Sequence, residues 1–138
     1  MRFVYLISTL MFVGTTFAVR AGFDNAFDNA AGDMNTVSCS TGFNGLASQF
    51  PTFGSLPTFP NIGGASAIAG FDSTECGSCW QLTFPTTGKS INVTAIDHAG
   101  DGFNLSQEAL DELTNGNAVA VGAIQVDAVE VDRSACGL

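Results

Sequence analysis

The clearest signal in this sequence is the alternation of apolar and polar residues in two neighbouring segments. Residues 79–84 and 90–97 both alternate, as strands do when they bury one face. A turn at Thr87-Gly88 lies between them, so the two segments predict a β-hairpin. Asp97 ends the second strand with the same parity as its apolar positions, which are Ile91, Val93 and Ala95.

Alternation returns in residues 118–132, but its phase changes twice. The changes fall at Gly122-Ala123 and near Asp127-Ala128. Each predicts a bulge or bend of the kind that a strand curling around a small barrel needs. Residues 63–70, which are rich in small side chains, predict another strand. The chain is therefore expected to be mainly β.

Helical patterns are few and short. Residues 105–114 predict one good helix, which Asn104 or Ser106 can cap and Asn115-Gly116 can end. Residues 41–50 are compatible with a second short helix.

The remaining segments predict little regular structure. Residues 51–64 carry three prolines and predict a loop, and residues 23–28 predict an initial strand or loop.

The first 18 residues have the layout of a cleaved secretory signal peptide. Arg2 precedes an apolar run over residues 3–13, and small residues lead to a cleavage site after Ala18. The run is shorter than the roughly 20 residues that a membrane span needs. Residues 19–138 would then form one secreted domain.

Four cysteines in a secreted chain predict two disulfides. They are Cys39, Cys76, Cys79 and Cys136, and the sequence permits three pairings. A bond from Cys76 to Cys79 would close a tiny loop and constrain the unfolded chain very little, so a pairing that closes long loops is favoured. A redox role for the pair is disfavoured, because alternation continues after Cys79 instead of a helix beginning there.

The negative charge of the chain limits the classes of molecule that it can bind. The formal net charge is −9 at pH 7, and loss of Arg2 with the signal peptide makes it more negative. Such a surface repels nucleic acids and anionic membranes but is compatible with neutral polysaccharide. The chain has one histidine, and oxidised cysteines do not ligate metal, so we predict no metal or cofactor.

Candidate chemistry is limited to carboxylates and aromatic rings. Asp97 and Asp101 are the first candidates for the acid pair of a glycosidase, but Asp97 is more simply explained as a carboxylate accepting backbone N–H groups at a strand end. Trp80 is expected to pack in the core against a disulfide. The loop positions Phe53, Phe59 and Phe71 are candidates for exposure.

A series of short motifs runs in order through nearly the whole predicted mature chain. They are Val37-Ser38-Cys39-Ser40, Asn44-Gly45-Leu46, Ile62-Gly63-Gly64-Ala65, Cys76-Gly77-Ser78-Cys79-Trp80-Gln81-Leu82-Thr83, Ala95-Ile96-Asp97-His98-Ala99, Gly102-Phe103-Asn104, Leu113-Thr114-Asn115-Gly116-Asn117-Ala118-Val119 and Cys136-Gly137-Leu138. Their content and order resemble the cerato-platanin family of secreted fungal proteins.

The resemblance implies a fold and a function. The fold is a six-stranded double-ψ β-barrel like that of expansins, with disulfides Cys39–Cys76 and Cys79–Cys136. The implied protein lies in the fungal cell wall or medium and binds chitin oligomers or cellulose-like polysaccharide. It loosens walls without hydrolysis and acts on plants as an elicitor or toxin, with plant surface receptors as further candidate partners.

The resemblance also implies site residues. Asp97 matches the family's groove aspartate by position, and Asn104 matches a neighbouring groove residue. Phe71 is the third carbohydrate-binding candidate, although the family usually places Trp or Tyr there, with a polar group that Phe lacks. Asn92 and Asn104 begin glycosylation triplets, and a glycan on Asn104 would cover the groove.

The sequence therefore predicts a non-catalytic carbohydrate-binding protein, monomeric or weakly self-associating. Two alternatives stay open at this point. One is a weak endoglucanase on β-glucan. The other is a self-assembling, film-forming surface protein whose Phe-rich loops drive association.

Overall fold

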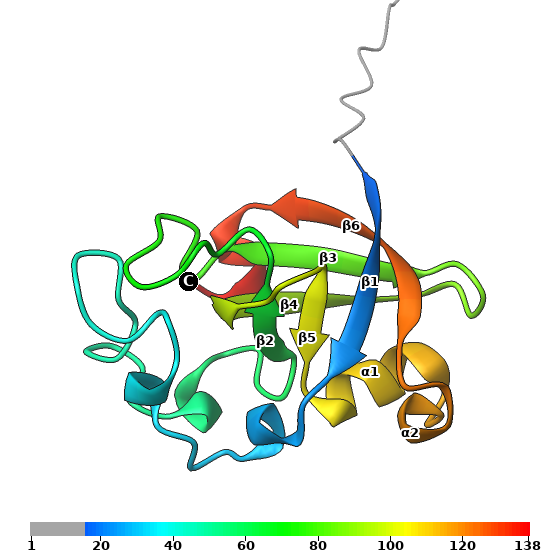
Figure 1. The fold of residues 1–138 in the computed structure, drawn as a ribbon, viewed down its shortest axis with the longest axis horizontal. Coiled ribbons are helices and arrows are strands. Elements are labelled where there is room, and N and C mark those ends of the chain that lie inside the picture. Colours follow the sequence, from blue (N-terminus) through cyan, green and yellow to red (C-terminus); the bar gives the residue numbers. More distant parts are fainter. Residues whose placement is uncertain (1–15) are drawn as a thin grey trace, which may run out of the picture.

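The alternating segments form the wall of a closed barrel in the computed structural model, which describes residues 16–138. Its strands pair in the order β1-β5-β2-β4-β3-β6 (Figure 1). The six strands are β1 (Phe17–Phe23), β2 (Ile62–Ala65), β3 (Cys79–Phe84), β4 (Lys89–His98), β5 (Phe103–Leu105) and β6 (Ile124–Val131). The predicted hairpin is β3 and β4, which pair antiparallel in regular register.

Two of the strand pairs are parallel, and the rest are antiparallel. β1 runs parallel to β5, and β2 runs parallel to β4. Parallel neighbours need crossover connections, so other strands lie between the members of each parallel pair in the chain: β2, β3 and β4 between β1 and β5, and β3 between β2 and β4. Together with the two disulfides, this confirms the expected six-stranded double-ψ barrel.

The irregularity in the barrel wall lies where β2 pairs with β4, and it leaves Ile96 of β4 as the extra residue. β6 keeps an unbroken register with both of its neighbours, so of the bulge or bend predicted near Asp127-Ala128 the structure excludes the bulge. The register instead shifts between Gly63 and Gly64, which face Ala95 and Asp97. Glycines permit such a shift because no Cβ obstructs the neighbouring backbone.

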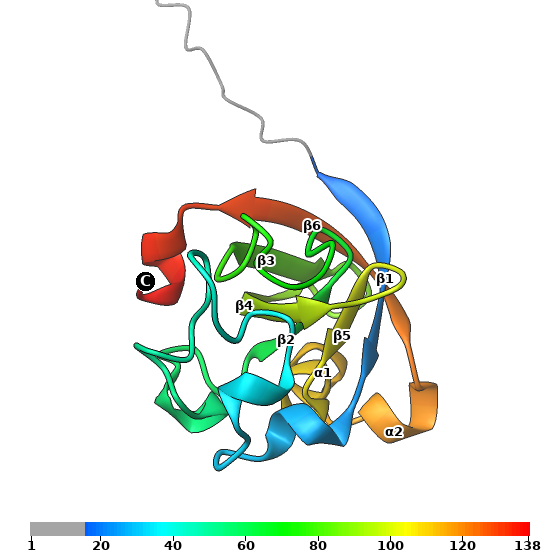
Figure 2. The same ribbon diagram turned by 60° about the vertical axis from the view of Figure 1, so that its left-hand side comes forward.

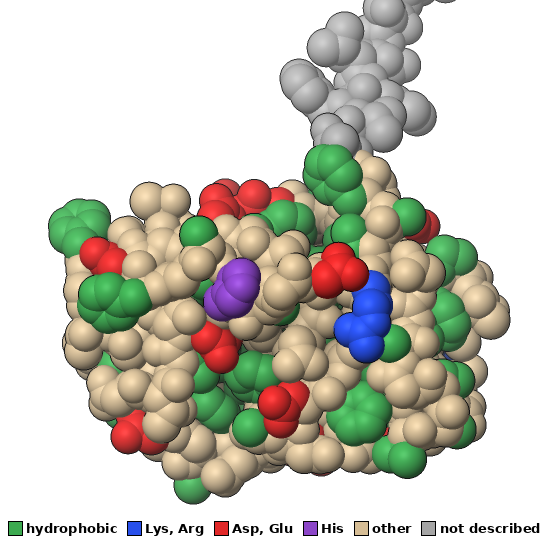
Figure 3. Space-filling view, viewed as in Figure 1, with side chains coloured by type: hydrophobic (Ala, Val, Ile, Leu, Met, Phe, Trp, Pro, Cys, Tyr) green, Lys and Arg blue, Asp and Glu red, His purple; other side chains and the backbone are tan. Residues whose placement is uncertain are grey.

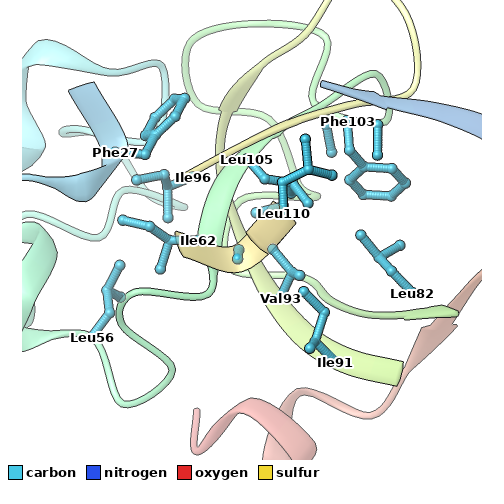
Figure 4. Close-up of a cluster of buried hydrophobic side chains, with 14 of the residues drawn as sticks. Phe27, Leu56, Ile62, Leu82, Ile91, Val93, Ile96, Phe103, Leu105 and Leu110 are labelled. Carbon is cyan, nitrogen blue, oxygen red and sulfur yellow. The ribbon is translucent and has the colours of Figure 1, made fainter. Parts of the chain in front are cut away.

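The interior of the barrel is filled by the apolar positions of the alternating strands. Leu82, Val93 and Leu105 are almost fully buried. Figure 4 shows side chains from β2, β3, β4, β5 and α1 converging on this core. Interior burial of this kind is the main stabilising contribution to the fold.

The predicted good helix is α1 (Gln107–Thr114), which begins two residues later than expected. Ser106 is its N-cap, and the Ser106 hydroxyl accepts a hydrogen bond from the Ala109 N–H. The carboxylate of Asp28 accepts hydrogen bonds from the first two N–H groups of the helix, those of Gln107 and Glu108. Asn115 ends the helix in the left-handed conformation.

Residues 41–50, for which a second short helix was considered, form turns instead. The N–H of Leu46 donates to Cys39 O and that of Ala47 donates to Ser40 O, seven residues back instead of four. Gly42 has a φ of 90°, which a right-handed helix cannot include.

Two strand predictions were too long. Residues 118–121 form one helical turn, α2 (Ala118–Val121), where a strand was expected. Asp111 Oδ1 accepts the Ala118 N–H and fixes the start of this turn. The predicted strand over residues 63–70 shrinks to the four residues of β2, and turns follow it.

Residues 24–61 and 66–78 form a layer of loops beside the barrel, which we call the loop layer. Figures 1 and 2 show it on one side and below the strands. Its regular elements are three 3-10 helices, at Asn25–Asp28, Met34–Thr36 and Phe53–Ser55, and a fourth at Arg133–Cys136 follows β6. The Cys39–Cys76 disulfide crosslinks the loop layer, and Cys79–Cys136 joins β3 to the last 3-10 helix.

The predicted signal peptide lies largely outside the described residues. Cleavage after Ala18 would remove Phe17 and Ala18 from the start of β1, where they pair with Ala128 and Asp127. Within residues 16–138, no helix has the length and hydrophobicity to cross a membrane.

Candidate functional site

Asp97 and Asn104 lie on the outer face of the barrel, on either side of β2. Gly64 of β2 pairs with both of them, and Asn104 also pairs with Gly22 of β1. Paired residues point to the same face of a sheet, and strands are about 4.8 Å apart, so Asp97 and Asn104 are about 10 Å apart. We call these four positions the outer-face row. It explains how two residues seven positions apart in sequence share one surface.

The outer-face row has two side chains and two glycines. A Cβ on Gly64 would lie 3.0 Å from His98 O, and one on Gly22 would lie 3.0 Å from the Arg20 guanidinium. The half-buried Asn104 amide has no hydrogen-bond partner among residues 16–138. The His98–Ala99 segment therefore covers Gly64 and the Arg20 side chain covers Gly22, so the row offers a ligand the Asn104 amide and the Asp97 carboxylate at its two ends.

Asp97 is held firmly at the end of β4. Its Oδ1 accepts hydrogen bonds from Ser38 N (3.0 Å), Ser38 Oγ (2.8 Å) and His98 N (2.9 Å). The expectation of a carboxylate accepting backbone N–H groups at a strand end is confirmed. One carboxylate oxygen thus fixes the loop layer to the barrel, while Oδ2 accepts no hydrogen bond within residues 16–138.

A depression of about 680 Å³ adjoins Asp97 on the side of the loop layer. Its lining is polar and acidic around two buried rings, and comprises Asp24, Asn25, Ala26, Phe27, Asn29, Gly32, Asp33, Thr36, Val37, Phe53 and Asp97. Asp24 and Asp33 are N-caps whose Oδ1 atoms accept backbone N–H groups of Ala26 and Asn35. Sequence reasoning missed this depression, although Asp-x-x turns were a visible signal for the caps.

Phe71, the third predicted site residue, lies outside the depression. Phe71 is 66% exposed on the loop between β2 and β3, and it does not line the depression. The loop that carries Phe71 contacts the end of β4 through Ile68, whose carbonyl O lies 2.6 Å from His98 Nδ1. Phe71 is thus exposed as expected.

The other aromatic residues behave differently from Phe71. Phe53 is buried against Phe27, and Phe59 is half-buried, so neither forms an exposed surface. Trp80 is half-buried, packs edge-on against Phe103 and donates its indole N–H to Ser78 Oγ. This places Trp80 at the barrel core through a ring contact with β5.

Figure 3 shows the side of the molecule seen in Figure 1, where acidic side chains outnumber basic ones. Uncharged polar and backbone atoms dominate the middle of this face, and hydrophobic side chains protrude at its edges. No group of three metal-binding side chains occurs within residues 16–138. The chemistry available here is hydrogen bonding and ring packing.

Comparison with known proteins decides the family. The family model described as Cerato-platanin matches residues 19–138. The chain belongs to the cerato-platanin family. A solved structure of cerato-platanin 2 from M. perniciosa is 60% identical, covers 88% of this chain and 100% of its own, and superposes with a TM-score of 0.86.

Curated relatives agree with this family assignment. An allergen of Aspergillus fumigatus is 48% identical over 118 residues, which are 86% of this chain and 76% of the allergen. Cerato-platanin of Ceratocystis fimbriata f. sp. platani is 40% identical over 129 residues, 94% of either chain. A Clavibacter michiganensis expansin shares the fold alone, at 19% identity and a TM-score of 0.55, and this chain covers 51% of it.

Proposed function

We propose that this cerato-platanin is a secreted protein that binds cell-wall polysaccharide, with chitin oligomers as the first candidate ligand, and that it does not hydrolyse it. The observation that carries the proposal is the outer-face row, in which Asn104 and Asp97 flank the side-chain-free Gly64. The Asn104 amide can donate and accept, and the Asp97 carboxylate can accept from sugar hydroxyl or acetamido groups.

Charge and crosslinks support the same proposal. The net charge of −9 favours a neutral ligand over phosphate-rich ones. Two disulfides are typical of proteins that work in an oxidising compartment outside the cell. A firmly held Asp97 is preorganised, so less freedom is lost on binding.

The proposal includes wall loosening and elicitor activity because of what related proteins are described to do. A related cerato-platanin, 40% identical, is described as a fungal elicitor, and the expansin with the shared fold was crystallised as an aspartate-to-asparagine variant with cellohexaose. Binding at the outer-face row would let the chain compete for contacts between polysaccharide strands without cleaving any bond.

Hydrolysis is a second candidate, because three carboxylates line one depression beside Asp97. Glycoside hydrolysis needs one protonated acid and one base facing each other across the bond. Asp24, Asp33 and Asp97 instead each accept backbone N–H groups through one oxygen, which suits structural carboxylates. We therefore favour binding, and a reducing-end assay on soluble β-glucan separates the two candidates.

The test is a titration of the 15N-labelled mature chain with chitin tetramer, followed by NMR. We expect the largest amide shifts at Gly22, Gly64, Asp97 and Asn104. The Asn104→Ala variant should bind about tenfold more weakly, because it removes the amide that donates and accepts. Asn92→Ala is the matched control, since Asn92 lies in β4 and its amide donates to Ala135 O instead.

Two results would contradict the proposed function. One is an absence of shifts in the outer-face row at saturating tetramer. The other is release of reducing ends from β-glucan that disappears in the Asp97→Asn variant, which keeps an oxygen acceptor for Ser38 but removes the charge.

A further inference from the structure

Two phenylalanine rings protrude from neighbouring loops of the loop layer. Phe43 is 98% exposed and Phe71 is 66% exposed, although large apolar side chains are normally at least half buried. Figure 3 shows hydrophobic side chains standing out on this side, over the loops at the left of Figure 1. Two such exposed rings on adjoining loops indicate a binding surface.

The loops that carry the rings are fastened to each other beside them. The N–H of Asn44, next to Phe43, donates to Asp72 Oδ1 at 2.8 Å, and the Asn44 amide donates to Asp72 O at 3.1 Å. A Cβ on Gly42 would lie 2.7 Å from Asp72 Cγ, so only glycine lets the loops approach this closely. The backbones under the two rings are thus held together from both sides.

Further contacts fix this pair of loops to the molecule. The Cys39–Cys76 disulfide crosslinks them. Arg133 donates from its guanidinium to Cys76 O at 2.7 Å and to Thr74 O at 2.9 Å. Binding at the rings therefore costs little ordering of the backbone.

The chemistry around the rings selects the partner. Asp72 lies directly after Phe71 and contacts Asn44, so a surface that covers both rings also approaches its carboxylate. A second copy or another protein would have to desolvate that charge, and this chain offers four basic residues against thirteen acidic ones. A sugar surface packs its C–H groups on the rings and donates hydroxyl hydrogen bonds to the carboxylate.

We propose that Phe43 and Phe71 form a rigid aromatic platform for the flat face of an insoluble, neutral polysaccharide. The platform shares no residue with the outer-face row, which is proposed to bind a single sugar chain. It depends on the proposed function only because both sites are assigned the same class of ligand, a neutral polysaccharide. It would anchor the protein on a wall surface while the row engages individual chains.

The test is depletion binding of the disulfide-bonded mature chain to insoluble β-chitin and to microcrystalline cellulose. We expect Phe43→Ala with Phe71→Ala to weaken adsorption to at least one polymer about tenfold, with unchanged affinity for soluble chitin tetramer. Val119→Ala is the matched control, because Val119 is 68% exposed on α2, outside the platform. Replacement of both rings by Trp should strengthen adsorption severalfold, which keeps the test valid if the alanine variant folds poorly.

The outcomes separate the platform from the row. If Asn104→Ala no longer binds the soluble tetramer but still adsorbs to the insoluble polymers, the protein has two sites. If only the Phe variants lose adsorption, the platform is supported even when the tetramer does not bind at the outer-face row. Adsorption within twofold of wild type in the double alanine variant would overturn the platform. So would a dimer in sedimentation that the double variant abolishes while adsorption is kept, since the rings would then serve a second copy.

Discussion

The barrel and the loop layer bury apolar side chains to the same degree but by different means. In the barrel, Leu82 and Leu105 are buried by strands whose backbone groups pair in long registers. In the loop layer, Met34 and Phe53 are equally buried. The backbone hydrogen bonds around them are made by turns and Asp caps, and a disulfide crosslinks the layer. The barrel therefore depends on a repeated pattern, and the loop layer on individual residues.

The candidate binding sites are divided between these two regions. The outer-face row uses the rigid barrel wall, whereas the depression and the Phe43–Phe71 platform lie at or within the loop layer. Loops on a rigid scaffold commonly carry recognition because they can vary without loss of the fold. The following experiments test whether the two regions are as separable as this comparison implies.

The largest expected effect is loss of the loop-layer crosslink. Cys39→Ser with Cys76→Ser should lower the free energy of unfolding by about 4 kcal/mol, because the bond closes a loop of 37 residues in sequence separation. Chemical denaturation measures the loss. Amide hydrogen exchange should quicken mainly in residues 24–61 and 66–78, and an equal increase throughout the barrel would show that the regions are not separable.

A core truncation in the barrel should act globally. Leu82→Ala should cost about 3 kcal/mol, because it removes a fully buried side chain from a closely packed interior. The same denaturation experiment measures it, with the exposed Val119→Ala as control, for which a change under about 0.5 kcal/mol is expected. A cost below about 1 kcal/mol would mean that the barrel interior relaxes to fill the space.

A smaller effect is expected at a residue that joins the two regions. Ser106 caps α1 and donates its hydroxyl hydrogen bond to Pro60 O at 2.5 Å, in the loop before β2. Ser106→Ala should cost about 1.5 kcal/mol, since it leaves the buried Ala109 N–H and Pro60 carbonyl without this partner. Thermal unfolding measures it, and Ser48→Ala, on the exposed part of the loop layer, serves as the neutral control.

The smallest expected effect is a pH dependence at the contact between the two regions. The pKa of Glu130 is raised, mainly by a hydrogen bond to the Glu75 carboxyl group and to a smaller extent by burial and by the negative charge of Glu75. The positive charge of Arg133 partly opposes this rise. A buried oxygen of Glu75, Oε2, has no donor in the described chain, and a protonated Glu130 is a neighbouring group able to donate.

The sign of this dependence follows from the raised pKa. The folded protein binds the Glu130 proton more tightly than the unfolded chain, so this stabilisation is complete below about pH 4.5 and is lost as pH rises through the folded pKa. Because Glu130 is largely exposed, the change should stay below about 1 kcal/mol. Comparison of Tm at pH 4 and pH 7 for wild type and Glu130→Gln checks it, and an identical slope in both proteins would exclude this pair as the cause.

Several elements were predictable because their signals are local. Strict alternation identified β3 and β4, and a cap, an apolar face and Asn115-Gly116 identified α1. The errors arose where a local pattern fits two structures. Residues 118–121 alternate as a strand does, but Asp111 captures the Ala118 N–H and makes a helical turn.

The candidate site was predictable in part. The position of Asp97 at the end of β4 predicted a backbone-bonded carboxylate, which is confirmed, and Phe71 is exposed as expected. The parity that Asp97 shares with the interior positions of β4 did not predict its face, because the register shift opposite Gly64 brings it into the outer-face row. Ser38 as the partner of Asp97, and Phe43 as the neighbour of Phe71, were missed. Both depend on contacts between segments far apart in the chain, at 59 residues for Ser38 and Asp97.

By itself, the sequence determined that β3, β4 and β6 are strands, that the cysteines are oxidised pairs, and which family the motifs match, but it did not predict β1 or β5. Periodicity, composition and motif order are properties of neighbouring residues, so no fold is needed to detect them. The tertiary structure alone decided that β2 lies between β5 and β4, which brings Asn104, Gly64 and Asp97 into one row. Strand order and register are set by the packing of the whole barrel, and a segment's own pattern does not name its neighbours.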